Sequence, residues 1–516
     1  MKRKLVWRNE RTLYKRACDF CGKSIITIHH PRYPAPVYCF ECHRSDKWDP
    51  YSYGLIYDSS RPFFEQLGKL MIRIPKAATH VGTGGSQNIN SEYVNFAGGN
   101  KNCYLIFNST HNEDCSYSRG IANSKNVTDS YFGNKSELVY EGINVNKSSR
   151  INWGENVVDS IDSSFVLNCV GIQNCFGCVN LRHKSYYFFN EPLPKDDWVK
   201  RVSEIMGSYQ KMEEVKKRFK EFSLKFIRRE NNNLKSVNCF GEYIFESKNC
   251  AHCFESFNCE DSKYSFATKL MKDSYDVVGR GMESELLLET VATGSGSSRI
   301  LGSWSVETSH DVEYSYDLRG CEYCSGCAGL KHARYCILNK QFSEGEYKKT
   351  RDKIIGELKD KGLYGLYFSP ELSPWAYNET LAQEFYPLTK GRALAEGFRW
   401  EDEIPRTEGK ETLQPEQIPD NIRDIKDSIL DEILKCEDCG YNYRIIRPEL
   451  EFYRRMLIPA PHKCFNCRHL DRIRRRGSFK LHHRKCAKCK RSIQTTYPPD
   501  RPEIVYCEKC YQTEVV

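Results

Sequence analysis

The middle of the chain repeats one short pattern of polar and hydrophobic positions from about residue 89 onward. Each unit begins with Asn or Asp, continues with Cys or Ser, and ends with an aromatic or aliphatic residue. Turn-forming Asn, Asp, Gly and Ser separate these brief strand-like runs. The pattern is typical of a right-handed parallel β-helix, in which like residues stack on successive rungs. Clear examples are KNCYL (101–105), EDCSYS (113–118), TDSYF (128–132), LNCVG (167–171) and QNCFGC (173–178).

This region occurs twice. The segment NCFGCVNLRHKSYYFFN (174–190) aligns with YCSGCAGLKHARYCILN (323–339), and SELVYE (136–141) aligns with SELLLE (284–289). A predicted helix follows each copy, and the second helix opens with the capping box Ser343-x-x-Glu346. The middle of the chain is therefore a tandem duplication of β-helix segments, each closed by a helix.

The two ends of the chain carry one small cysteine module each, and the two modules align without a gap after a shift of 468 positions. A third module lies just before the second of them. In each module two C-x-x-C pairs flank a loop of 17 to 24 residues, as in zinc ribbons and treble clefs. Four thiolates leave no open position on Zn²⁺, so we expect three structural zinc sites. The ligand sets are Cys18/Cys21/Cys39/Cys42, Cys436/Cys439/Cys464/Cys467 and Cys486/Cys489/Cys507/Cys510.

These patterns predict a mainly β fold, with duplicated right-handed parallel β-helix segments and short helices flanked by zinc-ribbon or treble-clef modules. The expected segments are zinc module 1 (1–60), a helical connector (61–88), β-helix segment 1 (89–191), a helix (192–236), β-helix segment 2 (237–340), a helix (341–362), an irregular aromatic region and linker (363–420), zinc module 2 (421–470) and zinc module 3 (471–516).

The net charge of the whole chain is small, but one segment near the C-terminus is strongly basic. Three zinc sites at −2 each would lower the formal net charge from +9 to +3, yet residues 468–491 hold eleven Lys or Arg and one acid, Asp471. Basic zinc modules commonly contact phosphate, although these cations also suit charge balance at the thiolates or an acidic protein partner. The candidate nucleic-acid-binding residues are Arg8, Arg16, Arg472, Arg474, Arg475, Arg476, Lys480, Arg484, Lys485, Lys488, Lys490 and Arg491.

Thirteen further cysteines lie in the middle region. Two sets recur in both copies with a histidine behind them: Cys169, Cys175, Cys178 and His183, and Cys321, Cys324, Cys327 and His332. They fit a stack of buried cysteines inside the β-helix, two more zinc sites of the Cys₃His type, or, with the poorest spacing, an iron–sulfur site.

No candidate active site emerges. The recurring pairs Glu137/Glu141 and Glu285/Glu289 are four residues apart, about 13 Å on a strand, which is wider than paired glycosidase carboxylates require. No nucleotide-binding, hydrolase or metalloprotease motif occurs. Neither an export signal nor a membrane-spanning stretch is found, so we expect a cytoplasmic protein without a membrane partner.

The expected function is a non-enzymatic zinc-binding scaffold that binds nucleic acid, with RNA, including ribosomal RNA, favoured over DNA. The alternatives are a scaffold for a protein assembly and, third, a β-helix enzyme that acts on a polysaccharide or nucleotide.

The order of motifs across nearly the whole chain resembles a family of uncharacterised zinc-ribbon proteins from genomes of ultra-small bacteria. The resemblance rests on RNERTLYKRACDFC (8–21), SPWAYNETLAQEFYPLTKG (373–391), ELEFYRRM (449–456) and RPEIVYCEKCY (501–511). It implies zinc-ribbon modules around a cysteine-rich middle, and no established activity. Members often carry another zinc module before the RNER segment, whereas only the seven residues MKRKLVW precede that segment in this sequence.

Overall fold

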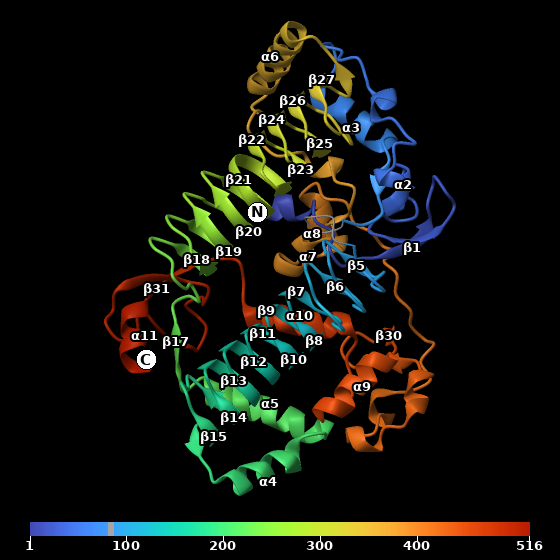
Figure 1. Ribbon diagram of the computed structural model, residues 1–516. Helices are drawn as coiled ribbons and strands as arrows, with labels where there is room; N and C mark the ends of the chain where they lie inside the picture. The colour runs from blue at the N-terminus through green and yellow to red at the C-terminus, as the bar shows by residue number, and fades with distance from the viewer. Residues whose placement is uncertain (81–86, 516) are drawn as a thin grey trace. The chain divides into compact units, whose positions relative to one another are not determined.

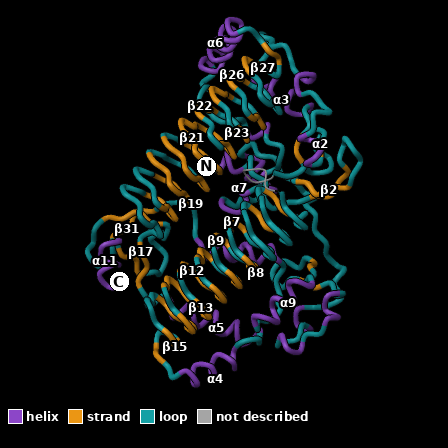
Figure 2. Tube along the Cα trace, viewed as in Figure 1, coloured by secondary structure: helices purple, strands orange, loops and turns teal. Residues whose placement is uncertain are grey.

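The computed structural model describes residues 1–80 and 87–515, and the fold is mainly β with short helices (Figures 1 and 2). The chain forms two compact units, and each unit combines two separate stretches of sequence. Unit 1 comprises Met1–Thr79 and Asn231–Ile404, and unit 2 comprises His80–Glu230 and Pro405–Val516. Each unit therefore joins one copy of the duplicated middle region to one end of the chain.

Unit 2 is built on a 12-stranded sheet in which nearly all strands are parallel. Its strands are β5 (Val94–Asn95), β6 (Ile106–Phe107), β7 (Arg119–Ala122), β8 (Lys125–Thr128), β9 (Tyr131–Asn134), β10 (Glu137–Tyr140), β11 (Ile143–Asn146), β12 (Ser149–Val158), β13 (Ile161–Val170), β14 (Gln173–Val179), β15 (Ser185–Phe188) and the antiparallel β16 (Glu191–Pro192). Helices α4 (Lys195–Ile205) and α5 (Tyr209–Ser223) follow, and α5 packs on β13 and β14.

The second stretch of unit 2 carries β29 (Leu434–Lys435), β30 (Asn442–Tyr443), β31 (His482–Lys485), β32 (Ser492–Thr495) and β33 (Ile504–Tyr506), with helices α9 (Arg447–Met456), α10 (Phe465–Arg476) and α11 (Glu508–Val515). Strand β33 pairs in parallel with β17 (Ile227–Arg229), which closes the first stretch of the unit.

Unit 1 is built on an 11-stranded, parallel-rich sheet whose strands rise in succession toward helix α6 (Figure 1). Its strands are β18 (Phe240–Phe245), β19 (Ala251–Glu260), β20 (Phe266–Lys272), β21 (Tyr275–Gly294), β22 (Ser298–Leu301), β23 (Trp304–Glu307), β24 (His310–Glu313), β25 (Tyr316–Arg319), β26 (Glu322–Ser325), β27 (Arg334–Ile337) and the antiparallel β28 (Lys340–Gln341).

The N-terminal stretch of unit 1 contributes β1 (Tyr14–Ala17), β2 (Ser24–Thr27), β3 (Val37–Tyr38) and β4 (Lys76–Ala77), with helices α1 (Lys2–Leu5), α2 (Phe40–Arg44) and α3 (Phe63–Arg73). Helices α6 (Glu344–Asp360), α7 (Leu381–Phe385) and α8 (Lys390–Ala395) follow its sheet. The predicted capping box is present at α6, where Ser343 and Glu346 cap one another's backbone N–H groups.

The repeat of the middle region is a step of 12 residues from strand to strand. In unit 2, Lys125 pairs with Glu137, Glu137 with Ser149, and Ser149 with Ile161. In unit 1 most steps are also 12 residues, but Lys272 pairs with Glu285 and Glu285 with Ser298, which are steps of 13. Unit 1 therefore holds two single-residue insertions that break the regular repeat.

The Asn/Asp–Cys/Ser pattern follows from the backbone at the corners of each repeat. Asn102, Asp114 and Asn126 have φ near +50°, a left-handed conformation that Asn and Asp tolerate better than most residues. The next side chain then points inward, and a serine there satisfies the backbone of the following repeat. Ser136 N–H donates to Ser124 Oγ at 3.2 Å, and Ser148 N–H donates to Ser136 Oγ at 3.3 Å. Buried polar side chains are thus hydrogen-bonded in a ladder.

Candidate metal centres and the basic surface

Three clusters of four cysteine thiols form at the predicted positions. Within each cluster all four sulfur atoms lie within 4.8 Å of one another. The sets are Cys18/Cys21/Cys39/Cys42 in unit 1, and Cys436/Cys439/Cys464/Cys467 and Cys486/Cys489/Cys507/Cys510 in unit 2. We refer to them as modules 1, 2 and 3.

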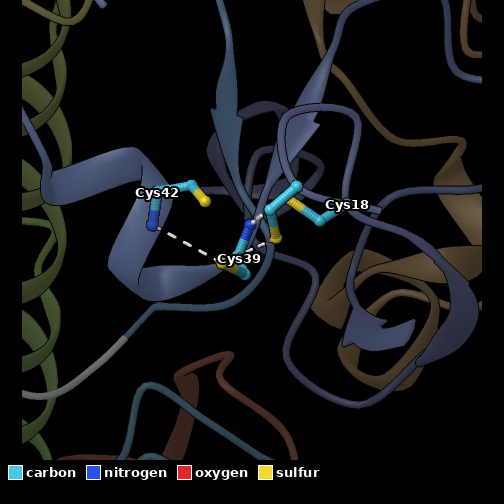
Figure 3. Close-up of side chains that lie close together, drawn as sticks. Cys18, Cys39 and Cys42 are labelled. Carbon is cyan, nitrogen blue, oxygen red and sulfur yellow. Dashed lines mark hydrogen bonds between the residues drawn. The ribbon is translucent and has the colours of Figure 1, made fainter. Parts of the chain in front are cut away.

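Each module uses a short strand and the start of a helix to aim its thiols. In module 1 the first knuckle follows β1, and Cys39 caps the N-terminus of α2 (Figure 3). Cys39 N–H donates to Cys18 Sγ at 3.2 Å, and Cys42 N–H donates to Cys39 Sγ at 3.5 Å. Modules 2 and 3 repeat the first of these bonds, from Cys464 to Cys436 at 3.2 Å and from Cys507 to Cys486 at 3.3 Å.

The same N–H groups favour thiolates. Burial opposes the charged form of Cys18, but hydrogen bonds from the backbone of Cys39, Cys21 and Phe20 outweigh it and lower the pKa of the thiol to about 7. In module 3 burial again opposes ionisation, and the backbone N–H groups of Cys507, Cys489 and Lys488 lower the pKa of Cys486 to about 6. One thiol in each of these two modules is therefore ready to bind a metal near neutral pH.

The sulfur spacing fits zinc. A tetrahedron with Zn–S bonds of about 2.3 Å has sulfur–sulfur edges of about 3.8 Å. The Sγ–Sγ distance is 4.0 Å for Cys21 and Cys39, 3.8 Å for Cys439 and Cys464, and 3.7 Å for Cys489 and Cys507. Three structural zinc sites are thus compatible with the geometry, and the closed sets of four thiols leave no ligand position for a substrate.

The recurring Cys₃His sets do not assemble into a fourth or fifth cluster of this kind among the described residues. Their six cysteines, Cys169, Cys175, Cys178, Cys321, Cys324 and Cys327, are fully buried. The two histidines are exposed at left-handed corners of the backbone, so each histidine ring lies outside while its cysteines lie inside.

Both histidines cover a glycine of the preceding repeat. A Cβ atom on Gly171 would lie 2.4 Å from His183 Nδ1, and one on Gly320 would lie 2.7 Å from His332 Nδ1. The recurrence of histidine in both copies therefore has a packing explanation: the ring lies over a corner where only glycine fits. Of the three alternatives for the cysteines, this placement agrees with the buried stack.

Several of the predicted phosphate-binding cations lie in the interior. Arg8, Arg472 and Arg476 are at most 5% exposed, so a ligand cannot reach their guanidinium groups. Arg8 bonds to Glu10 at 2.5 Å, and the Arg476 guanidinium lies 3.9 Å from the centre of the Phe479 ring. The prediction that these three arginines bind nucleic acid is therefore wrong, because their side chains are buried and bonded within their own units.

Arg472 makes a buried ion pair with two acids of the strand stack in unit 2. Its guanidinium lies 2.7 Å from Glu141 and 3.0 Å from Asp129. Arg475 adds a second contact with Glu141 at 2.9 Å, and Arg468 reaches Asp129 at 2.8 Å. The C-terminal stretch is thus fixed to the strand stack by the buried pairs of Arg468 and Arg472, with the more exposed Arg475 at the edge.

Unit 1 repeats this arrangement with Lys4 in place of Arg472. The Lys4 ammonium lies 2.8 Å from Asp276 and 2.9 Å from Glu289. Lys4 and Arg472 are related by the same shift of 468 positions as modules 1 and 3, while Glu141 and Glu289 are the last residues of SELVYE and SELLLE. The duplication therefore includes both the modules and the way in which each is attached to a strand stack.

Other predicted cations have partners at the surface. These contacts are Arg16 to Asp19 at 2.9 Å, Arg474 to Asp471 at 2.7 Å, Lys488 to Glu514 at 2.6 Å, Arg491 to Glu230 at 3.6 Å, and Arg484 to the Glu503 carbonyl oxygen at 3.1 Å. Exposed pairs of this kind contribute little and exchange readily, and Lys488 and Arg491 are exposed cations of this surface.

Three exposed lysines of module 3 form the remaining basic surface: Lys480, Lys485 and Lys490. Within the described part of the chain, neither Lys480 nor Lys485 makes an ion pair, and Lys490 bonds only to the Ala487 carbonyl oxygen of its own knuckle at 2.9 Å. We call Lys480, Lys485, Lys488, Lys490 and Arg491 the module 3 basic face.

Sequence reasoning missed the acids that neutralise the interior cations. Asp129 and Glu141 lie more than 300 residues before Arg472, and no local pattern marks them as its partners. The signal that could have found them is the joint recurrence of SELVYE/SELLLE and of the terminal modules, since both members of each pair are duplicated.

No protein-family model matches the chain, and a search of curated proteins also finds no match. None of the helices within the described residues has the length and apolar character of a membrane-spanning helix.

Proposed function

We propose that the chain is a scaffold, held together by three zinc modules, that binds the phosphate backbone of nucleic acid through the module 3 basic face. The closed thiol sets provide rigidity rather than chemistry. The five cations of this face are exposed and lie within twelve residues of sequence, in or beside strand β31 and the first knuckle of module 3. Such a surface attracts phosphates through counterion release.

The observation that carries this proposal is the backbone at Lys490. The residue after the first knuckle is in the left-handed region in all three modules, with φ of +74° at Gly22, +73° at Gly440 and +63° at Lys490. Glycine adopts this conformation without strain, whereas a side chain there costs about 1 kcal/mol. Module 3 thus places a lysine where its two counterparts have glycine, and a locally unfavourable residue often marks function.

RNA is the favoured ligand. Recognition of duplex DNA commonly places a helix in the major groove, but α11 of module 3 carries Glu508 and Glu514, which phosphates would repel. A strand-and-knuckle surface of a few cations instead suits single-stranded or folded RNA, whose phosphates are accessible without groove insertion.

We also infer that each strand stack is a right-handed parallel β-helix with one rung per 12-residue step. Parallel partners at a constant step support this reading, because the chain must return to the same side of the stack after every repeat. Crossovers between parallel strands are almost always right-handed. In this architecture the β-helices are the rigid bodies that carry the zinc modules.

The test measures binding of a short single-stranded RNA to the zinc-loaded full chain as salt rises. Replacing Lys480 and Lys485 with Gln and Lys490 with Gly should weaken binding and lower the slope of log K against log salt by about 2, at roughly 0.7 for each phosphate that is no longer neutralised. The control replaces Lys200, Lys217 and Lys220 with Gln; these lysines are exposed on α4 and α5 and make no ion pair within residues 1–80 and 87–515.

Lys490→Gly alone should change thermal stability and RNA binding in opposite directions. It should raise the thermal midpoint, because the strained lysine is removed, while it weakens RNA binding. Equal salt slopes for the module 3 variant and the control variant, or no RNA binding at low salt, would contradict the proposal and favour a protein partner.

A further inference from the structure

A groove of about 430 Å³ crosses the strand stack of unit 1. One side chain from each of five successive repeats lines it: Glu260, Lys272, Glu285, Ser298 and His310. Volumes of this size hold small-molecule ligands in other proteins. Leu270 and Met271 add apolar surface to the polar row.

The groove lies at the two insertions of unit 1. The steps from Lys272 to Glu285 and from Glu285 to Ser298 each contain one extra residue. Small residues are required there, because a Cβ atom on Gly294 would lie 2.0 Å from the Gly281 carbonyl oxygen. An insertion of this kind bends a strand and redirects side chains, as β-bulges beside active sites do.

Unit 2 supplies an internal comparison for this row. Its equivalent residues are Glu113, Lys125, Glu137, Ser149 and Ile161, with uninterrupted 12-residue steps. There Lys125 is paired with Glu113 at 3.3 Å. In unit 1, by contrast, Lys272 has no acid within ion-pair distance among the residues that the structure describes.

The largest chemical difference between the two rows is His310 in place of Ile161. The His310 Nδ1 atom lies 2.9 Å from Ser298 Oγ, a hydrogen bond between a hydroxyl and an imidazole at the edge of the groove. With the ring proton on Nε2, Nδ1 accepts the Ser298 proton. A hydroxyl and a base at this separation meet the first geometric requirement for an activated serine nucleophile, a hydrogen bond between the two side chains.

We propose that Ser298 and His310 form a nucleophile–base dyad that cleaves small carboxylic esters in this groove. Ser298 Oγ attacks the acyl carbon while its proton passes to His310 Nδ1. The bond from the acyl carbon to the alcohol oxygen then breaks, and His310 returns the proton to that alcohol. Water hydrolyses the acyl-serine by the same proton transfers, so the products are a carboxylic acid and an alcohol and no redox partner is needed.

The negative charge that develops on the carbonyl oxygen of the substrate must be stabilised by a hydrogen-bond donor or a cation. The backbone N–H groups of Ser298 and Gly296 donate to the carbonyl oxygens of Ser309 and Met282, respectively. These two N–H groups are therefore not free to donate to the substrate oxygen. Lys272 lies two strands from Ser298 in the row, with Glu285 between them, and makes no ion pair within the described chain. We assign its long, flexible side chain to reach this oxygen.

The 516-residue chain is first treated with a fluorophosphonate, which labels activated serines, and the label is located by peptide mass spectrometry. We expect modification at Ser298, with loss of the label in Ser298→Ala. His310→Ile, which restores the residue of the other copy, and the polar variant His310→Gln should each slow labelling and p-nitrophenyl acetate cleavage by about 100-fold or more. Lys272→Gln should slow ester cleavage while leaving the Ser298–His310 pair in place.

Ser149→Ala is the matched control, because Ser149 holds the same row position in the copy without insertions. It should leave labelling and ester cleavage unchanged. Absence of label at Ser298 in the folded protein, or label that persists at the full rate in both His310 variants, would overturn the dyad. RNA binding by Ser298→Ala should equal that of the unmodified protein, so this result is independent of the proposed scaffold function.

Discussion

At the scale of single residues, the same amino-acid types serve opposite purposes in this chain. Arg472 is fully buried between Asp129 and Glu141, whereas Arg474, two positions later, is exposed. Their difference arises from the face of α10 on which each lies, because helical residues two apart do not share a face. The basic run could be read from the sequence, but the buried members could not be separated from the exposed ones without the distant acids.

Arg472→Ala tests the buried ion pair of unit 2. Removal of the guanidinium leaves Asp129 with Arg468 alone and Glu141 with the exposed Arg475 alone. The free energy of unfolding should therefore fall by about 3 kcal/mol, the lower end of the cost of breaking a buried ion pair. Arg472→Lys should cost less, since unit 1 uses Lys4 at the equivalent position. Denaturant unfolding of the zinc-loaded protein measures both.

Arg474→Ala is the control for this prediction, because its side chain is exposed and its partner Asp471 lies on the same helix. Its effect should stay within about 0.5 kcal/mol. If Arg472→Ala cost no more than Arg474→Ala, the buried pair would not be what fixes the C-terminal stretch.

Lys76 is a buried cation of unit 1. Its side chain is 1% exposed, and its ammonium lies 3.9 Å from the centre of the Tyr316 ring. Burial lowers the pKa of Lys76 to about 7, although Asp317 opposes this shift. An unfolded lysine keeps a pKa near 10.4, so between about pH 7 and pH 10 folding releases a proton.

The sign of the pH effect follows from that release. Because the unfolded chain binds the extra proton, Lys76 makes the free energy of unfolding rise with pH above 7, by at most about 1.4 kcal/mol per pH unit. Lys76→Met should therefore be more stable than the natural chain at pH 7, and the gap should narrow at pH 9. Denaturant unfolding of both proteins at the two pH values tests this; a constant gap would show that Lys76 stays charged when folded.

At the scale of elements, the strand stacks follow from a repeat that can be recognised in the sequence. Asn or Asp occupies the left-handed corner and Cys or Ser follows it and points inward. This pattern can be read directly from the sequence, so the repeated short strands of the middle region could be predicted. The insertions are visible as well: the spacing between equivalent residues grows from 147 for Lys125 and Lys272 to 149 for Cys175 and Cys324. The sequence does not show that a groove lies at these insertions.

Gly320→Ala tests how tightly the corners of the stack are built. Gly320 has φ of +61°, and a Cβ atom would lie 2.7 Å from the His332 ring, so the substitution should cost about 1–3 kcal/mol of stability. Adding His332→Ala should recover part of this loss. Thermal unfolding provides the measurement.

Gly345→Ala gives the opposite expectation. Gly345 lies in the first turn of α6 with open space around it, so alanine should stabilise the helix by up to about 1 kcal/mol. Similar effects of the two alanines would contradict the close contact assigned to His332.

At the scale of the whole molecule, the chain contains two units, each built on one copy of the strand stack and assembled from segments that alternate along the sequence. Module 1 belongs with the second copy of the strand stack, and modules 2 and 3 belong with the first copy. The sequence predicts each segment separately, since each has its own local pattern. It does not predict which module joins which stack, because the joining ion pairs connect residues hundreds of positions apart.

We expect the twelve cysteines of the modules to hold zinc, whereas the cysteines of the strand stacks fill the interior. The most direct test is the zinc content per chain of the purified protein, compared with a variant in which Cys175, Cys178, Cys324 and Cys327 are replaced by Ala. We predict three zinc ions in both proteins, and two after Cys436→Ser. Five zinc ions in the natural chain, falling to three in the four-alanine variant, would contradict the account.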